Sequence, residues 1–339
     1  MKKISRKIAV LGGGSFGTAI ANMLALNGHQ VHLWLRDKTR AKMININHLN
    51  SQYFPDLLLD ESLKATTAID VALESAELVF MAVPSHSCRS VSRLLGKHLK
   101  DKNVFIISTN KGIENPSFKL MSEVIHCELP HNPVGVMSGP NLAKEIVARQ
   151  ISATVIASKN EALISTAQDV LHSSYFRAYS STDVLGVELA GALKNIYAVL
   201  SGMAAALGVG QNTIGLILTR SLAEMSRFAI QLGANPMTFL GLSGVGDLVV
   251  TCNSPLSRNY QVGYTLGQGK DIDDALGGVN QVVEGVNTLQ IVKKKADELS
   301  VYMPLVDALY CVLYEKQSLG EVISQMMMRE QNADVDALL

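Results

Sequence analysis

The fold is decided near the start of the chain, where the sequence is Lys7-Ile8-Ala9-Val10-Leu11-Gly12-Gly13-Gly14-Ser15-Phe16-Gly17. The first five residues form an aliphatic run, which is typical of a buried β-strand. Three glycines follow, and residues 17–27 have the apolar composition of a buried helix that Gly28 closes. A strand, a glycine-rich turn and a helix in this order are typical of the first unit of a parallel α/β sheet.

Residues 12–17 fit the pattern G-x-G-x-x-G, and their position between a strand and a helix predicts a dinucleotide-binding site. Gly12 allows the tight turn, Gly14 lets backbone N–H groups approach a pyrophosphate, and Gly17 lets the helix pack close to its strand. The helix N-terminus adds partial positive charge. A plain strand–turn–helix connection that tolerates glycines is the alternative interpretation.

The end of the second predicted strand, residues 30–35, indicates which dinucleotide binds. The strand is followed by Arg36-Asp37. An acidic residue at position 36 would hydrogen-bond the ribose 2′-hydroxyl of NAD(H), whereas a guanidinium can bind the 2′-phosphate of NADP(H) through two parallel hydrogen bonds. We therefore expect NADP(H) to be preferred, and Asp37 keeps NAD(H) compatible with the sequence. The alternative for Arg36 is that it stacks on adenine or lies in water.

The alternation of strands and helices continues through the first half of the chain and then stops. Further strands are expected at residues 78–83, 104–108, 134–137, 154–157 and 176–179. From Asp183 onward the sequence has long helical patterns, the clearest at residues 183–207, 212–232 and 284–299, and no convincing strand. We predict an α/β fold in which an N-terminal Rossmann-type parallel-sheet domain, residues 1–183, precedes an all-helical domain, residues 184–339. The family resemblance described below implies that this second domain binds the substrate.

Composition narrows the class of protein. The 339 residues are 47% hydrophobic and 18% charged, which excludes a disordered chain. The 30 basic and 30 acidic side chains cancel, which argues against a nucleic-acid-binding protein. The four cysteines have no CxxC spacing and the eight histidines no HxxxH or HExxH spacing, so we expect reduced thiols, a cytoplasmic location and no metal site.

Lys194 is the most unusual residue of the second half. It lies with Asn195 inside the longest apolar stretch, residues 189–209, which is nearly long enough to span a bilayer. The two polar residues favour a buried helix over an integral membrane segment. A lysine in such a helix either extends its ammonium to water at the rim or is kept for chemistry, where a neighbouring carboxylate can make it a proton donor.

Other polar groups lie where a ligand could bind. Asp247 is in a glycine-rich apolar stretch, although a turn or a helix cap would explain it equally. Ser257-Arg258-Asn259 offers a hydroxyl, a guanidinium and an amide that suit a phosphate, as an exposed loop also would. Asn110-Lys111-Gly112 and Ser138-Gly139-Pro140-Asn141 each follow a predicted strand directly, at the sheet edge where open α/β folds bind ligands.

On these residues the chain resembles the bacterial NAD(P)-dependent glycerol-3-phosphate dehydrogenases, nearly from end to end. The motifs that carry the resemblance are Gly12–Ala19, Val83-Pro84-Ser85, Asn110–Glu114, Ser138-Gly139-Pro140, Gly191–Asn195, Gly246-Asp247-Leu248, Ser257-Arg258-Asn259 and Val283-Glu284-Gly285. The lysine segment and the Ser-Arg-Asn cluster are highly specific in combination, whereas the glycine loop is not. Asn141 departs from the Ser or Thr more common in the family, and Leu200 replaces a usual small residue.

The resemblance implies a homodimer that reduces dihydroxyacetone phosphate, a phosphorylated triose, to sn-glycerol 3-phosphate for glycerophospholipid synthesis. It implies Lys194 as general acid/base, with Lys111 and Asp247 positioning and polarising the substrate. The implied cofactor contacts are Gly12, Gly14, Ser15, Phe16, Gly17, Arg36, Lys111, Ala143, Arg258, Val282 and Glu284. The implied substrate contacts are Lys111, Gly139, Asn141, Lys194, Asp247, Ser257, Arg258 and Asn259.

Two other functions stay open at this point. A β-hydroxyacid or 6-phosphogluconate-type dehydrogenase also joins a Rossmann domain to helices and uses a lysine. From a different class, a non-catalytic NADP(H)-sensing protein would need the glycine loop but not Lys194 or Asp247.

Overall fold

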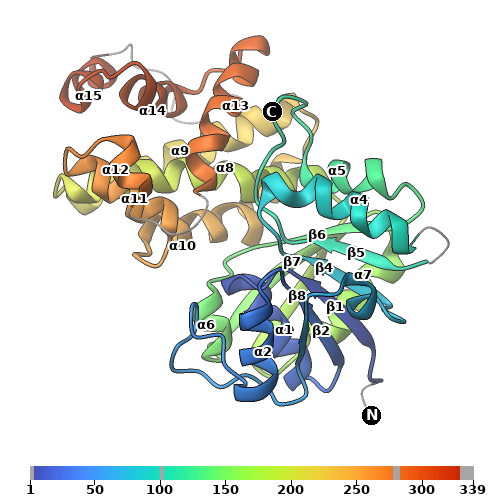
Figure 1. Ribbon diagram of the computed structural model, residues 1–339. Coiled ribbons are helices and arrows are strands. Elements are labelled where there is room, and N and C mark those ends of the chain that lie inside the picture. Colours follow the sequence, from blue (N-terminus) through green and yellow to red (C-terminus); the bar gives the residue numbers. More distant parts are fainter. Residues whose placement is uncertain (1–3, 100–102, 278–282, 329–339) are drawn as a thin grey trace. The chain divides into compact units, whose positions relative to one another are not determined.

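The computed structural model describes residues 4–99, 103–277 and 283–328, and the chain divides into two compact units (Figure 1). The first, the sheet unit, comprises the described residues up to Glu114 together with Lys119–Val184. The second, the helical unit, comprises Asn115–Phe118 and the described residues from Leu185 onward. The short segment Asn115–Phe118, which the sequence placed with the first domain, thus groups with the helices.

An eight-stranded sheet forms the centre of the sheet unit. Its strands are β1 (Lys7–Leu11), β2 (Gln30–Trp34), β3 (Lys64–Thr66), β4 (Leu78–Met81), β5 (Phe105–Ser108), β6 (Val134–Ser138), β7 (Ser152–Ser158) and β8 (Phe176–Ser181). They are ordered β3-β2-β1-β4-β5-β6-β7-β8. The order 3-2-1-4-5-6 is that of a doubly wound dinucleotide-binding sheet, so the Rossmann-type fold expected from the sequence is confirmed.

The sheet departs from the all-parallel expectation at one place. β6 and β7 pair antiparallel, whereas the other neighbouring strands are parallel. The chain between β6 and β7 contains only the five-residue helix α6 (Ala143–Val147). Five helical residues rise about 8 Å, which is too short to carry the chain back along a strand of about 17 Å. β7 therefore starts at the edge where β6 ends.

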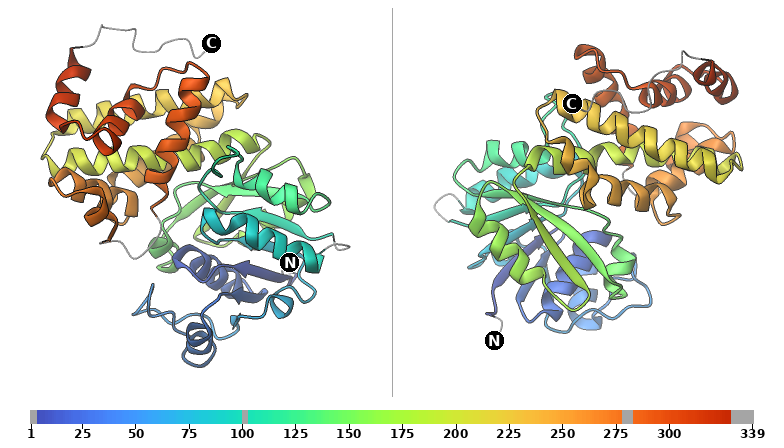
Figure 2. Two further views of the ribbon diagram at one scale, coloured as in Figure 1. Left: turned by 45° about the horizontal axis from the view of Figure 1, so that its top comes forward. Right: turned by 180° about the vertical axis from the view of Figure 1, so that it is seen from behind.

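Helices cover both faces of the sheet (Figure 2). Besides α6 they are α1 (Ser15–Leu26), α2 (Lys38–Asn47), α3 (Ile69–Ala72), α4 (Cys88–Leu99), α5 (Met121–Glu128) and α7 (Glu161–Leu171). Because side chains alternate along a strand, Ile8 and Val10 of β1 enter the core layer shared with α1, α2, α6 and α7. Ala9 and Leu11 enter the opposite layer, shared with α3, α4 and α5.

The described part of the helical unit contains helices and turns and no strand. Its helices are α8 (Val184–Ala206), α9 (Gln211–Gln231), α10 (Asp247–Asn253), α11 (Arg258–Gly267), α12 (Ile272–Gly277), α13 (Glu284–Glu298), α14 (Pro304–Tyr314) and α15 (Leu319–Met327). A 3₁₀ turn at Pro236–Leu240 and a π-turn at Leu242–Gly246 precede α10. The all-helical character expected from the sequence is therefore found in the described residues.

Helix α8 is buried around nearly its whole circumference. Among the described residues it is the one helix long and apolar enough to cross a membrane, but 83% of its most apolar window is buried in the protein. Its apolar surface is thus covered within the protein. The approach of α11 is especially close, because a Cβ on Gly202 of α8 would lie 2.1 Å from the Tyr260 carbonyl oxygen, and one on Gly263 of α11 would lie 1.9 Å from that of Val199.

Candidate active site

The glycine loop lies at the point where the strand order reverses. β1 pairs with β2 on one side and with β4 on the other, so the chain continues from β1 and from β4 toward opposite sides of the sheet, and open α/β sheets bind ligands at this position. Gly12 has a φ of +122°, and a Cβ on it would lie 2.4 Å from the carbonyl oxygen of Ala82, which follows β4. Only glycine lets the two loops approach this closely.

Gly14 and Gly17, the other two glycines of the motif, have different roles. A Cβ on Gly17 would lie 1.9 Å from the Gly12 carbonyl oxygen, so this residue permits the close packing of α1 on its strand. A Cβ on Gly14 would meet no atom within 4 Å. Gly14 is also the N-cap of α1 and supplies no side-chain hydrogen bond, so the first-turn N–H groups of α1 have no side-chain cap. This open, uncapped helix end fits a pyrophosphate, with Ser15 and Phe16 in its first turn.

At the end of β2, Arg36 is exposed and Asp37 is engaged by its own helix. Asp37 is the N-cap of α2, and its carboxylate accepts hydrogen bonds from the backbone N–H and the Nε of Arg40, both at 3.1 Å. The pKa of Asp37 is lowered mainly by the hydrogen bond from the Arg40 backbone. The hydrogen bond from the Arg40 side chain lowers it further. Asp37 is therefore an ionised helix cap whose two oxygens both have partners.

The loops after β5 and β6 lie side by side at the carboxyl edge of the sheet. Lys111, which follows β5, donates from Nζ to the carbonyl oxygen of Gly139, which follows β6, at 3.3 Å. Asn110 donates to the Val83 carbonyl oxygen after β4. Three successive loops of the sheet unit are thus joined, and Lys111 lies at the edge where a ligand of this fold binds.

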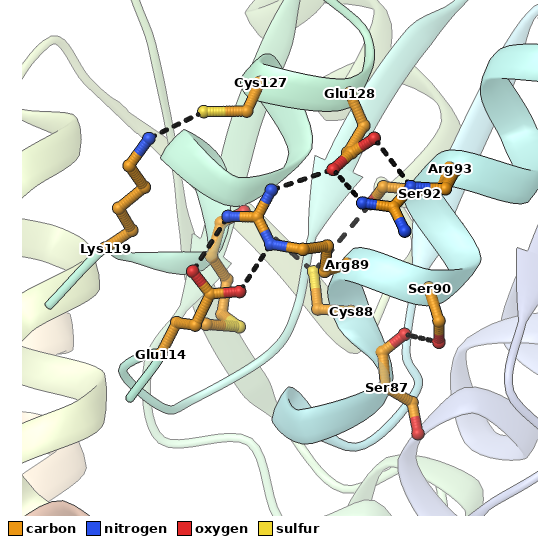
Figure 3. A network of polar contacts seen from close by, with 11 residues as sticks. Ser87, Cys88, Arg89, Ser90, Ser92, Arg93, Glu114, Lys119, Cys127 and Glu128 are labelled. Carbon is orange, nitrogen blue, oxygen red and sulfur yellow. Dashed lines mark hydrogen bonds and ion pairs between the residues drawn. The ribbon is translucent and has the colours of Figure 1, made fainter. Parts of the chain in front are cut away.

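A network of ion pairs fixes the loop that carries Lys111 (Figure 3). The Arg89 guanidinium binds both carboxylate oxygens of Glu114, at 2.6 and 2.8 Å, and reaches Glu128 at 2.8 Å. Arg93 also binds Glu128, and the two arginines together lower the pKa of that carboxyl. Because Glu114 is three residues after Lys111, the bidentate pair ties this loop to α4 and α5.

Asn141 is held by β7. Its Nδ2 donates to the Ala153 carbonyl oxygen at 2.9 Å, and its Oδ1 accepts from the Thr154 hydroxyl at 2.8 Å. Ala143, two residues later, begins α6 and packs against the core. Both polar atoms of the Asn141 side chain thus bind a neighbouring strand.

In the helical unit, Lys194 of α8 meets Asp247 of α10. Nζ lies 2.5 Å from Oδ1 of Asp247 and 2.5 Å from the hydroxyl oxygen of Thr251, while the side chains of Lys194 and Asp247 are 7% and 1% exposed. Thr251 is one helical turn after Asp247 and lies 3.3 Å from the same carboxylate oxygen. Gly244 makes the preceding π-turn possible, since a Cβ there would lie 2.2 Å from the Phe239 carbonyl oxygen.

The buried pair is electrostatically costly, because desolvating two charges costs free energy that their attraction repays only in part. Cys252, next to Thr251 on α10, is not a nucleophile at neutral pH. Burial raises the pKa of its thiol to about 12, against the lowering effects of Ser201 and Lys194, so it stays protonated at neutral pH.

The Ser257-Arg258-Asn259 cluster begins α11, and its members have different environments. Ser257 is the N-cap and accepts from the backbone N–H of Tyr260, while Arg258 is exposed. Asn259 is buried, donates to Asn195 Oδ1 at 3.0 Å and accepts from the backbone N–H of Gly285 at 2.9 Å. Asn259 therefore joins α8, α11 and α13.

The structure assembles the residues expected from the sequence in two sets. The sheet unit holds Gly12, Gly14, Ser15, Phe16, Gly17, Arg36, Lys111, Gly139, Asn141 and Ala143, and the helical unit holds Lys194, Asp247, Ser257, Arg258, Asn259 and Glu284. Val282 lies outside the described residues. Sequence reasoning missed Thr251, which the four-residue spacing from Asp247 on an apolar helix could have indicated.

Known proteins match the chain along nearly all of its length. Residues 7–164 match the family model described as NAD-dependent glycerol-3-phosphate dehydrogenase N-terminus, and residues 183–324 match the corresponding C-terminus model. An NAD(P)+ glycerol-3-phosphate dehydrogenase of Saccharophagus degradans is 53% identical over 97% of this chain and 92% of its own length. One from Pseudomonas entomophila is 51% identical over 97% and 96%.

A solved structure agrees with these matches. The crystal structure of glycerol-3-phosphate dehydrogenase from Coxiella burnetii superimposes with a TM-score of 0.91 at 33% identity, covering 96% of this chain and 99% of that one. The matches of both halves of the sequence and the likeness of the whole fold therefore indicate the same family. The chain belongs to the NAD-dependent glycerol-3-phosphate dehydrogenase family.

Proposed function

We propose that this chain is an NAD(P)H-dependent glycerol-3-phosphate dehydrogenase that reduces dihydroxyacetone phosphate to sn-glycerol 3-phosphate, reversibly. The observation that carries the proposal is the buried Lys194–Asp247 ion pair with Thr251 beside it. A lysine–aspartate ion pair buried between apolar helices suits proton transfer to a substrate. A protein that only senses the cofactor would not need such a pair. The names of relatives more than 50% identical over 97% of the chain support the substrate assignment.

The sheet unit serves as the cofactor-binding domain in this proposal. The uncapped start of α1 holds the pyrophosphate against backbone N–H groups, and Arg36 binds the 2′-phosphate, so that NADP(H) is preferred and NAD(H) is accepted. Ala143, Arg258, Val282 and Glu284 supply further contacts. When bound, the nicotinamide supplies the hydride that the C2 carbonyl carbon receives.

The helical unit serves as the substrate-binding domain. Lys194 donates a proton to the carbonyl oxygen as negative charge develops there, and its ammonium stabilises that charge. Asp247 and Thr251 hold Nζ in place for this transfer. Lys111, Gly139, Asn141, Ser257, Arg258 and Asn259 position the substrate and its phosphate, to which guanidinium, hydroxyl and amide groups donate.

We further propose that the enzyme is a cytoplasmic homodimer whose product supplies glycerophospholipid synthesis. Size-exclusion chromatography with light scattering of the full chain tests the dimer, for which twice the 36.5 kDa chain mass is expected. A monomer would contradict that part of the proposal and leave the reaction untouched.

A substrate comparison separates the proposal from its alternatives. We expect dihydroxyacetone phosphate to drive oxidation of NADPH, followed as loss of absorbance at 340 nm, and 3-oxo acids to give none. Turnover of a 3-oxo acid alone would favour a β-hydroxyacid or 6-phosphogluconate-type enzyme. NADPH binding without turnover of any phosphorylated ketone would favour a sensor.

A further inference from the structure

Arg40, in the first turn of α2, is held against the glycine loop by three groups. Its Nε lies 3.1 Å from Oδ2 of Asp37, and Nη1 donates to the Gly13 carbonyl oxygen at 3.4 Å. The guanidinium carbon lies 5.7 Å from the centroid of the Tyr53 ring, within cation–π range. The side chain is 25% exposed, so the guanidinium is positioned and still open to a ligand.

The Gly13 carbonyl group has a second side-chain donor. Asn50, which is 1% exposed, donates from Nδ2 to the same oxygen at 3.3 Å and to the Thr18 hydroxyl oxygen of α1 at 2.9 Å. Arg40 and Asn50 thus hold the peptide that directly precedes Gly14. The guanidinium is fixed to the loop that receives the pyrophosphate in the proposed function and lies beside the end of β2.

Asp37 is the only acidic residue in the segment 34–40 at the end of β2, and Arg40 binds its carboxylate. Oδ1 of Asp37 accepts from the Arg40 backbone N–H and Oδ2 from its Nε, so a ribose hydroxyl would have to share each oxygen with a donor that is already in place. The guanidinium charge also offsets the carboxylate charge, which would otherwise repel a phosphate. Of the five guanidinium N–H groups, these contacts use two, and three remain for a phosphate.

We propose that Arg40 is a second specificity-determining residue, which screens Asp37 and, with Arg36, binds the 2′-phosphate of NADP(H). The inference rests on the proposed function, because it assumes a nicotinamide dinucleotide on the glycine loop. In the sequence, Arg36 alone favours NADP(H) and Asp37 is available to NAD(H).

The test compares the affinities of NADPH and NADH in the full chain. Trp34, the one tryptophan of the sequence, lies on β2 and provides a fluorescence signal for both titrations. We expect Arg40→Gln to raise the Kd of NADPH about ten- to hundredfold, as for loss of a charge-assisted hydrogen bond, with the Kd of NADH within about twofold. Arg40→Lys keeps the positive charge but not the planar set of N–H donors, so its Kd for NADPH should lie between those of the wild type and Arg40→Gln.

Lys38→Gln is the matched control, because it removes the same charge from an exposed residue of the same helical turn. Its NADPH-to-NADH affinity ratio should equal that of the wild type. An unchanged ratio in both Arg40 variants, or an equal loss of both cofactors, overturns the inference and leaves Arg40 a support of the Gly13 carbonyl. A wild-type chain that binds neither cofactor overturns the proposed function as well.

Discussion

Lys194 and Asp247 are 53 positions apart in the sequence and 2.5 Å apart in the structure, measured from Nζ to Oδ1. They lie on α8 and α10, and the protein covers both side chains almost completely. A buried lysine without its carboxylate would be an uncompensated charge, so the effects of the two residues on the free energy of unfolding depend on each other. Their separate contributions to turnover can therefore be found only by varying both.

We expect Lys194→Met to lower kcat by at least about 10²–10⁴-fold, the usual contribution of a general acid, while NADPH still binds. The same substitution leaves Asp247 buried without its ammonium, so it should also lower the free energy of unfolding by about 3–5 kcal/mol. Steady-state kinetics, NADPH titration and urea unfolding measure the three quantities.

The double variant Lys194→Met/Asp247→Asn separates chemistry from stability. It removes both charges, so stability should recover in part while kcat stays at the level of the single variant. Recovery of kcat together with stability would show that the lysine acts only through the fold.

The glycine loop offers a matched pair of alanine substitutions. Gly14→Ala places a methyl group where the structure has no atom within 4 Å, so the thermal unfolding midpoint should stay within a few degrees while NADPH affinity falls at least about tenfold. Gly12→Ala combines a φ of +122° with a Cβ 2.4 Å from a carbonyl oxygen, so it should destabilise the fold itself. If Gly14→Ala binds NADPH as the wild type does, the pyrophosphate is not on this loop.

Arg36→Asp tests the end of β2 as a cofactor selector. An added carboxylate would repel a 2′-phosphate and could accept from a ribose hydroxyl, so kcat/KM for NADPH relative to NADH should fall by at least about tenfold. Arg36 is exposed, and the fold should tolerate the change. An unaltered ratio would mean that Arg36 has no part in cofactor choice.

Glu224 of α9 predicts how stability depends on pH. It is 2% exposed, accepts from the backbone N–H groups of Leu305 and Val306 and from the Tyr197 hydroxyl, and burial raises its pKa to about 8. Between about pH 4.5 and 8 the folded state therefore keeps a proton that the unfolded state has lost. The free energy of unfolding should fall with rising pH in this window, by up to about 1.4 kcal/mol per unit from this group.

Urea unfolding of the wild type and Glu224→Gln at pH 5.5, 6.5 and 7.5 checks this dependence. Glutamine does not titrate, so the variant should lose less stability as pH rises, whatever its stability at any single pH. The exposed Glu298→Gln should keep the wild-type slope. Equal slopes in Glu224→Gln and the wild type would show that Glu224 is already ionised in the folded protein.

Sequence reasoning succeeded where the signal is local. The aliphatic run before Gly12, the glycine spacing and the apolar helix around Lys194 follow from neighbouring residues, and all seven strands expected from the sequence are present with bounds within two residues. β3 was missed because Lys64-Ala65-Thr66 is short and has no apolar run. The reversed direction of β7 was missed because it depends on the brevity of α6.

The contacts that define the site depend on tertiary packing and were not predictable in the same way. The sequence singled out Lys194 and Asp247 separately, but their pairing requires the packing of α8 with α10. The sequence leaves Asp37 available to a ribose hydroxyl, whereas in the structure it caps α2 and forms an ion pair with Arg40. Asn259 looked like a ligand for substrate, and the structure adds its bonds to Asn195 and Gly285.

We propose that Lys194 supplies the proton in a cofactor-dependent reduction of dihydroxyacetone phosphate. The most direct measurement is the rate of NADPH oxidation with saturating dihydroxyacetone phosphate, compared between the wild type and the Lys194→Met/Asp247→Asn variant. We expect turnover by the wild type and a rate at least about 10²-fold lower in the variant, with NADPH bound in both. Comparable rates in the two proteins would show that Lys194 is not the proton donor, and no wild-type turnover would show that dihydroxyacetone phosphate is not the substrate.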